Sequence, residues 1–187
     1  MDDSQQKTNT RNTTVRKATR IESVMNSAMW HLTQRDMTES ELIAKLKVKT
    51  DNQEWIDETL GTLKGFGYLK SDQVFAEQFV EQAFSGEFGS RYIVEKLKKK
   101  GLRDSVISDA IHKVSFEKSI DEQTILIDRI NHYYTSFTMS REKLVATLQK
   151  RGFSYQQVKV AIDQHSQAHE LKSLSLIHIS EPTRQLQ

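Results

Sequence analysis

The chain has 187 residues, a mass of 21.6 kDa and a net charge of +2, from 27 Lys and Arg against 25 Asp and Glu. Seven glycines and one proline are too few for the turns of a β-sandwich or barrel, and the lack of cysteine excludes disulfides, thiol nucleophiles and thiolate metal sites. No apolar run approaches the roughly 18–20 residues of a membrane span, and the N-terminus has no signal-peptide stretch. Composition therefore predicts a mostly helical, soluble, cytoplasmic protein without a membrane segment.

The first predicted segment, residues 1–20, is a polar N-terminal arm. It has little apolar surface to offset the entropy lost on ordering, so we expect it to be disordered. Its cations suit a flexible basic arm and a plain disordered tail equally well. They are Arg11, Arg16, Lys17 and Arg20.

An internal repeat with a period of 51 residues follows the arm. Leu46, Leu97 and Leu148 share one register of this repeat. Nine registers between positions 24 and 63 are apolar in all three copies, whereas chance would give about two. The chain therefore contains three copies of one structural unit.

Each copy of the repeat has apolar residues at i, i+1 and i+4 or at i, i+3 and i+4, which predicts three amphipathic helices. The copies are predicted at 21–70, 71–116 and 117–171. A three-helix unit of some 45 residues buries little surface alone. We therefore expect an all-α fold of three tandem three-helix repeats that stack into an elongated, curved array.

Local sequence signals mark the ends of the second helix in each copy. Thr38 followed by Glu41 predicts a capping box at its start in the first copy. Gly101 and Gly152, one repeat apart, are placed to close the helix in the second and third copies. Thr50 takes this place in the first copy, so that turn is predicted to differ.

The last residues, SLSLIHISEPTRQLQ, do not fit the repeat. Their apolar residues have strand-like spacing, and the string resembles translated sequencing-adapter read-through. We predict that 172–187 is foreign to the protein or disordered, and that the native C-terminus is missing.

Motifs of catalysis are missing from the sequence. It has no G-x-x-x-x-G-K-[ST] phosphate loop, no G-x-G-x-x-G after a strand and no G-x-S-x-G elbow. The pair Gly86 and Gly89 is interpreted as a turn between helices. His165 and His169 have chelating spacing but no H-E-x-x-H pattern, so exposed helix histidines are the better interpretation. The sequence predicts a protein that is not an enzyme and has no catalytic residue, metal or cofactor.

Aromatic residues are the next candidates for binding. Trp30 and Trp55 have the flat rings that stack on unpaired bases, but their apolar neighbours favour the edge of the core. The pairs Phe66 with Tyr68 and Tyr133 with Tyr134 are likewise assigned to packing.

A basic segment, RYIVEKLKKKGLR, contains six cations and one acid between positions 91 and 103. A helix here turns Ile93, Val94 and Leu97 inward and spreads the cations over its exposed side, where they can neutralise phosphates or an acidic partner. Lysines that merely complement the helix dipole give the same pattern. The candidate binding residues are Arg91, Lys96, Lys98, Lys99, Lys100 and Arg103.

The other copies have cations at or next to the equivalent positions, so a basic edge along the whole array is predicted. These cations are Lys45, Lys47, Lys49, Lys150 and Arg151.

Several strings resemble the RecX family in order and spacing. HLTQRDMTESEL (31–42) is similar to its L-x-x-R-x-x-[ST]-x-x-E-L opening, and GYLKSDQVFAEQFV (67–80) to its G-Y-L-[ND]-D-x-x-[FY]-A-x-x-[FY]-V block. GEFGSRYI (86–93) and LKKKGL (97–102) resemble its turn-helix and L-x-x-K-G-[IL] ending. The resemblance covers about 21–165. Thr50, an insertion at 70–71 and a divergent third copy depart from the family pattern.

The resemblance implies a monomeric, non-enzymatic modulator of the RecA recombinase that lies in the groove of the RecA–single-stranded-DNA filament. Family members inhibit strand exchange, ATP hydrolysis and co-protease activity, and so act in DNA repair and the SOS response. Weak binding to free nucleic acid is compatible with this role. A direct DNA-binding protein that works without RecA is the alternative, and a structural adaptor is a third.

Overall fold

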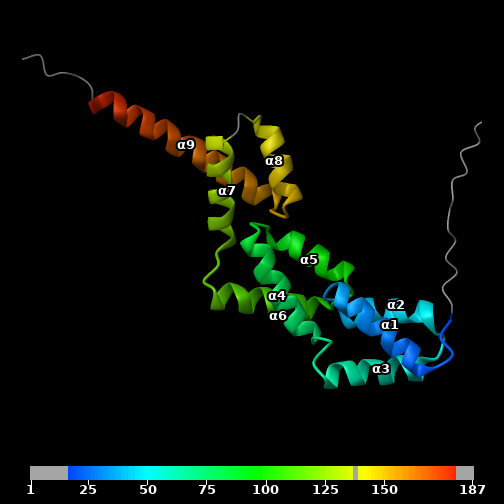
Figure 1. Ribbon diagram of the computed structural model, residues 1–187. Coiled ribbons are helices and arrows are strands. Elements are labelled where there is room, and N and C mark those ends of the chain that lie inside the picture. The colour runs from blue at the N-terminus through cyan, green and yellow to red at the C-terminus, as the bar shows by residue number, and fades with distance from the viewer. Residues whose placement is uncertain (1–16, 137–138, 180–187) are drawn as a thin grey trace, which may run out of the picture. The chain divides into compact units, whose positions relative to one another are not determined.

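A computed structural model describes residues 17–136 and 139–179, with their side chains over 17–135 and 139–167. Within these ranges every regular element is an α-helix, nine in all, which confirms the all-α prediction (Figure 1). None of these helices is both long and apolar enough to cross a bilayer. The chain divides into two compact units, 1–71 and 72–187.

The first unit is a three-helix domain. Helices α1 (Ile21–Gln34), α2 (Glu39–Lys49) and α3 (Gln53–Gly65) pack pairwise around one apolar core (Figure 1). The predicted capping box is present: the Thr38 hydroxyl accepts from the Glu41 N–H at 3.2 Å, and the Thr38 N–H donates to the Glu41 carboxylate at 3.3 Å. Both bonds satisfy N–H groups at a helix start that would lack a partner inside the helix.

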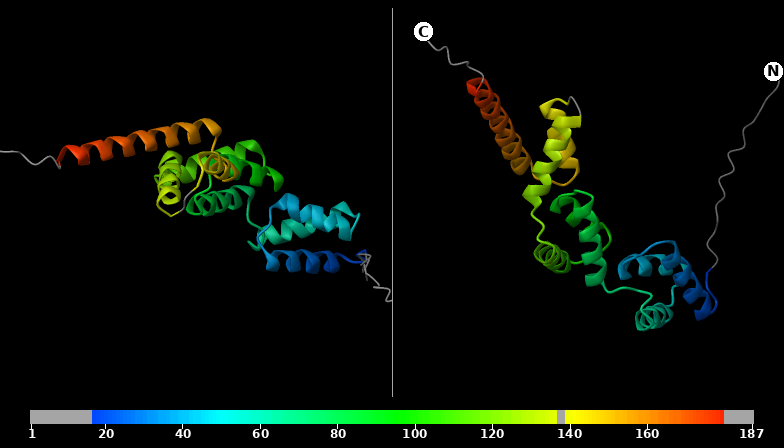
Figure 2. Two further views of the ribbon diagram at one scale, coloured as in Figure 1. Left: turned by 90° about the horizontal axis from the view of Figure 1, so that it is seen from above. Right: turned by 60° about the vertical axis from the view of Figure 1, so that its left-hand side comes forward.

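The second unit contains six helices and two cores. One core lies among the first three helices and the other among the last three, and Figure 2 shows these helices from two further directions. The helices are α4 (Asp72–Ser85), α5 (Ser90–Lys99), α6 (Asp104–Glu117), α7 (Glu122–Ser136), α8 (Arg141–Lys150) and α9 (Tyr155–Ile179).

The apolar registers of the repeat build all three cores. Leu46, Leu97 and Leu148 each have an exposed fraction of 0% and occupy the same place in the second helix of their copy. Burying a leucine stabilises the fold by roughly 1.5–3 kcal/mol relative to leaving it exposed. The repeat seen in the sequence is therefore a repeat of core positions.

The second helices end in two different ways, as predicted. Gly101 and Gly152 have φ angles of +83° and +94°, in the left-handed region that glycine enters without steric cost. Thr50 instead has an extended backbone, is buried, and accepts from the Asn52 N–H through its hydroxyl at 3.2 Å.

The predicted packing of the aromatic residues is partly wrong. Trp55 is half-buried against the first core and Tyr133 against the third, as predicted. Trp30 is 59% exposed, and Phe66, Tyr68 and Tyr134 are exposed as well. Trp30 follows the core residue Ala28 by two positions, which turns it about 200° around the helix, away from the buried stripe.

The two ends of the chain differ from expectation where the structure describes them. In the predicted arm, the Ala18 N–H donates to the Lys49 carbonyl at 2.8 Å and Lys17 pairs with Asp51, so residues 17–20 are ordered. Residues 1–16 lie outside the described part. At the other end α9 continues to Ile179, so the backbone of 172–179 is helical. The strand-like spacing of the apolar residues there was therefore a wrong indication of structure. A foreign origin of the tail stays a prediction.

We expect the first unit to lose stability as the pH falls from 7 to 5, because of His31. Burial, and then the charges of Lys45 and Arg35, lower the pKa of this imidazole. The unfolded chain therefore takes up the proton at a higher pH than the folded one. The contribution of His31 is fully present above its ordinary pKa of about 6.5 and is lost as the pH falls through that value toward the folded pKa.

Both tryptophans lie in the first unit, so denaturant unfolding followed by tryptophan fluorescence reports on this unit. The difference in unfolding free energy between pH 7 and pH 5 should shrink in His31→Gln. An equal difference in both proteins would contradict the assignment.

Candidate functional site

Helix α5 carries the basic segment, and its buried face sets the direction of the cations. Ile93 and Leu97, one turn apart, are fully buried in the core of the second copy. Five of the six candidate side chains are therefore exposed, and Lys100 is half-buried. The structure brings these six residues onto one segment of the second repeat, and the binding role assigned to them stays a prediction.

Two of the cations form exposed ion pairs. The Lys98 ammonium lies 3.0 Å from the Asp104 carboxylate at the start of α6, and Lys99 lies 2.6 Å from Glu95 one turn back. The hydrogen bond from Lys99 and then its charge lower the pKa of Glu95. Exposed pairs of this kind contribute little net free energy to stability. Both lysines can therefore leave these carboxylates and bind an anionic group of a partner molecule at a small cost in free energy.

Two further cations lie over aromatic rings. The Lys96 ammonium is 5.2 Å from the centre of the Tyr92 ring, and Lys100 is 5.2 Å from the centre of the Phe75 ring. Such contacts hold the ammonium groups near the protein surface. Arg91 and Arg103 form no ion pair within the part of the chain that the structure describes.

The N-terminus of α5 is held by the third repeat. Gly89 precedes the helix and has no side chain to cap it. Glu122 of α7 supplies the cap: its carboxylate accepts from the Ser90 N–H at 3.0 Å and from the Ser90 hydroxyl at 2.6 Å. A carboxylate there also complements the positive end of the helix dipole. The basic helix thus depends on the neighbouring repeat for its first turn.

The turn between α8 and α9 makes a second contact with this region. The Gly89 N–H donates to the Arg151 carbonyl at 2.8 Å, and the Arg91 N–H donates to the Gly152 carbonyl at 3.2 Å. The Arg151 guanidinium donates to the Gly86 carbonyl at 3.1 Å and lies 5.0 Å from the centre of the Phe88 ring. The interpretation of Gly86 and Gly89 as a turn between helices is confirmed.

These contacts also limit the predicted basic edge. In the third repeat the residue equivalent to Lys98 is the neutral Gln149. Of the two cations predicted for the edge there, Arg151 is engaged with the second repeat and Lys150 is exposed. In the first repeat Lys45 and Lys47 are exposed. The exposed cations of the predicted edge are therefore concentrated on the second repeat.

We expect Glu122→Gln to destabilise the second unit by about 1 kcal/mol, because the neutral amide weakens a charge-assisted bond and no longer complements the helix dipole. Amide exchange at Ser90 and denaturant unfolding followed by circular dichroism measure the effect. Glu117→Gln, which removes an exposed acid of α6, is the matched control. Equal results for the two variants would show that Glu122 does not cap α5.

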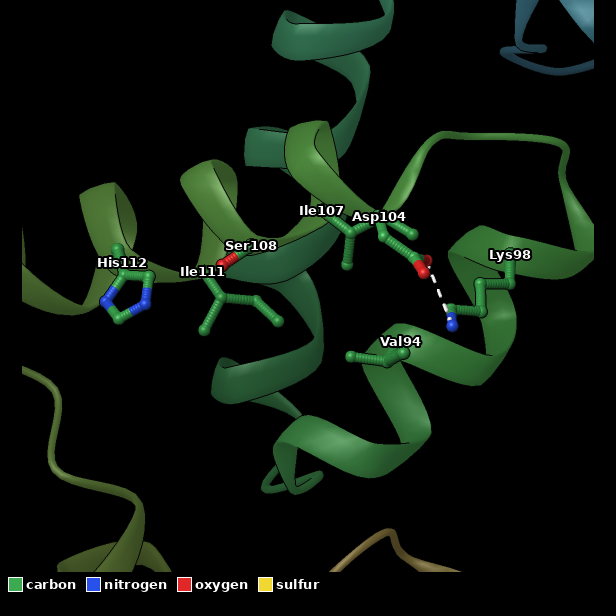
Figure 3. Close-up of a pocket in the computed structure, with 7 residues that line it drawn as sticks. All are labelled: Val94, Lys98, Asp104, Ile107, Ser108, Ile111 and His112. Carbon is green, nitrogen blue, oxygen red and sulfur yellow. Dashed lines mark ion pairs between the residues drawn. The ribbon is translucent and has the colours of Figure 1, made fainter.

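A surface recess lies beside the cations, between α5 and α6. It has a volume of about 360 Å³, and Val94, Ile107 and Ile111 form its apolar floor. Figure 3 shows the Lys98–Asp104 ion pair at one end and His112 at the other. Sequence reasoning placed Val94 in the core and did not predict the recess, because helical periodicity does not show where two helices diverge.

The residues considered for metal binding show no metal centre. Among the described residues no three His, Asp or Glu side chains gather in a way that could hold an ion. His165 stacks on the Tyr134 ring with the centres 4.5 Å apart. The side chain of His169 lies outside the described residues.

Comparisons with known proteins agree on one family. Residues 71–111, from just before α4 into α6, match the profile described as "RecX, second three-helix domain". A protein of Photobacterium profundum named "Regulatory protein RecX" is 38% identical over 124 residues, which cover 58% of this chain and 47% of the relative. The protein of that name from Lactobacillus johnsonii is 27% identical, with coverages of 80% and 56%. The chain spans about half the length of these relatives.

Solved structures show the same fold. A crystal structure of regulatory protein RecX superposes with a TM-score of 0.59 at 21% identity, covering 76% of this chain and 73% of the other. The structure of RecX from Lactobacillus salivarius gives 0.57 at 23% identity, with coverages of 77% and 95%. The matched domain contains all six candidate cations. The chain is therefore similar to RecX proteins, in sequence over residues 71–111 and in fold over 76% of its length.

Proposed function

We propose that the chain is a non-enzymatic regulator that binds the RecA filament on single-stranded DNA and lowers its activity. The observation that carries this proposal is the match of residues 71–111 to a RecX domain, because this segment also holds the exposed cations. A RecA–DNA filament presents phosphates and acidic side chains, and both attract such a surface. The proposed place of action is the cytoplasm, in DNA repair and the SOS response.

The contact is proposed to be electrostatic and independent of base sequence. Arg91, Lys98, Lys99 and Arg103 are exposed, and within the described ranges the acids that pair with Lys98 and Lys99 are themselves exposed. Reading bases in a groove needs side chains that reach base edges in a fixed geometry, for example Arg on guanine or Asn on adenine. Flexible lysines at a helix C-terminus suit phosphates and carboxylates instead.

The test is ATP hydrolysis by RecA in the presence of single-stranded DNA, measured as the chain is added. We expect a dose-dependent fall in rate that weakens as salt is raised, since screening and counterion competition both reduce the attraction. An unchanged rate at a stoichiometric ratio would contradict the proposal. An unchanged rate together with tight duplex binding in the absence of RecA would favour the DNA-binding alternative.

A further inference from the structure

The recess between α5 and α6 is the feature of the site that phosphate binding leaves unexplained. Its floor is aliphatic, and Figure 3 shows Val94 of α5 and Ile111 of α6 on opposite sides of the opening. A volume of about 360 Å³ lies near the lower end of the range of about 300–1,000 Å³ for small-molecule pockets. The space therefore suits one or two side chains of a partner.

The position of Ile111 is more exposed than its equivalents in the other two repeats. Ile111 is half-buried, whereas the residues at its position in the first and third copies, Leu60 and Ile162, are 4% and 0% exposed. The three positions have the same apolar character but only the second is left open. The fold buries this position in two repeats and leaves Ile111 accessible in the other. An accessible apolar side chain at such a position indicates a surface that binds another molecule.

Positive charge surrounds this opening on the α5 side. Arg91, Val94 and Lys98 follow each other at i, i+3 and i+7, so they share one edge of the helix. Arg103 lies at the start of α6 beside Asp104. Among the residues that the structure describes, Asp104 is the one acid that lines the recess, and it is already paired with Lys98.

We infer that the recess binds an acidic segment of a partner protein, which inserts an aliphatic or aromatic side chain between Val94 and Ile111. The carboxylates of that segment pair with Arg91, Lys98 and Arg103. Charge complementarity selects an acidic occupant, and the aliphatic floor selects a protein over a nucleic acid, whose phosphates would use the cations and leave the floor exposed to water. The acidic, apolar character of the partner follows from the recess itself. Only the identification of that partner with the RecA filament rests on the proposed function.

The probe is an eight-residue peptide of aspartate and glutamate with one central leucine, added to the full chain. We expect saturable shifts in the methyl resonances of Val94, Ile107 and Ile111. The same peptide with serine in place of leucine should bind at least about tenfold more weakly, because it has no leucine side chain to bury in the recess. Equal binding of the two peptides, shifts confined to other methyl groups, or no shift at millimolar peptide would each overturn the inference.

A blocking variant tests the place of binding. Ser108 is exposed and lines the recess, so Ser108→Trp should fill the opening without touching the core and reduce peptide binding at least about tenfold. Ser105 is exposed on the same helix and does not line the recess. Ser105→Trp should therefore bind the peptide as the wild type does. Undiminished binding to a folded Ser108→Trp, or methyl shifts caused by oligothymidine in place of the peptide, would overturn the inference.

The inference and the proposed function can fail separately. Peptide binding in the recess with no effect on RecA would keep the acidic partner and remove RecA as that partner. Inhibition of RecA by the wild type with no peptide binding would keep the function and remove the recess. Equal inhibition of RecA by Ser108→Trp and the wild type would likewise leave the function standing and place the filament contact elsewhere on the chain.

Discussion

Gly152→Ala is expected to destabilise the second unit by roughly 2–5 kcal/mol. A Cβ at this position would lie 2.3 Å from the Tyr92 nitrogen and 2.9 Å from the Gly89 carbonyl oxygen, which are backbone atoms that cannot rotate away. The φ angle of +94° adds strain for any side chain. The contact that holds the first turn of α5 must therefore open, or α8 must end differently.

The same substitution at Gly61 is the control, and its expected effect has the opposite sign. Gly61 lies exposed inside α3 with nothing within 4 Å of the added Cβ, so alanine should stabilise the first unit by about 0.5–1 kcal/mol. Tryptophan fluorescence reports on the first unit, and circular dichroism on both. We expect Gly152→Ala to shift only the circular dichroism transition. A wild-type unfolding curve for Gly152→Ala would contradict the contact with Tyr92.

Removing the exposed cations around α5 should weaken binding to the filament about 10–100-fold near 0.1 M salt. The variant changes Arg91, Lys98, Lys99 and Arg103 to glutamine. It leaves Lys96 and Lys100 in place, because their contacts with aromatic rings support the fold. If all four cations contact phosphates, the slope of log K against log salt becomes shallower by up to about four. A smaller change would indicate acidic side chains as their partners.

A matched variant removes four cations from other surfaces. Its positions, all changed to glutamine, are Lys113, Lys118, Lys143 and Lys159, each exposed in the second unit. The two variants have the same net charge, so general attraction to DNA falls equally in both. Equal loss of binding would contradict a specific role for the α5 surface.

The fold was predictable from sequence where the signals are local. The registers of Leu46, Leu97 and Leu148 and the capping box at Thr38 follow from spacing along one chain segment. The exposure of Trp30 was also predictable, because its position two residues after Ala28 places it opposite the buried stripe. The angular position of Trp30 on the helix was a better guide to its exposure than the apolar residue next to it in the sequence.

The support of the site was not predictable, because it depends on contacts between repeats. Glu122 lies 32 residues after Ser90, and Arg151 lies 65 residues after Gly86. Periodicity places each residue on its own helix and gives no information on which turn of another repeat it meets. Arg151 was assigned to a basic edge for this reason, although its guanidinium binds the turn before α5. Paired glycines at Gly89 and Gly152 were the one sequence signal of this close backbone approach.

Lysine acetylation of the wild-type chain, read by mass spectrometry with and without the RecA filament, tests the central claim most directly. Lys98 and Lys99 of α5 and Lys113 and Lys118 at the far end of α6 have similar exposure and each lies beside one acid. We predict that the filament slows acetylation of Lys98 and Lys99 and leaves Lys113 and Lys118 unchanged. Protection of Lys113 and Lys118 with free reaction of Lys98 and Lys99 would contradict the assignment of the α5 surface.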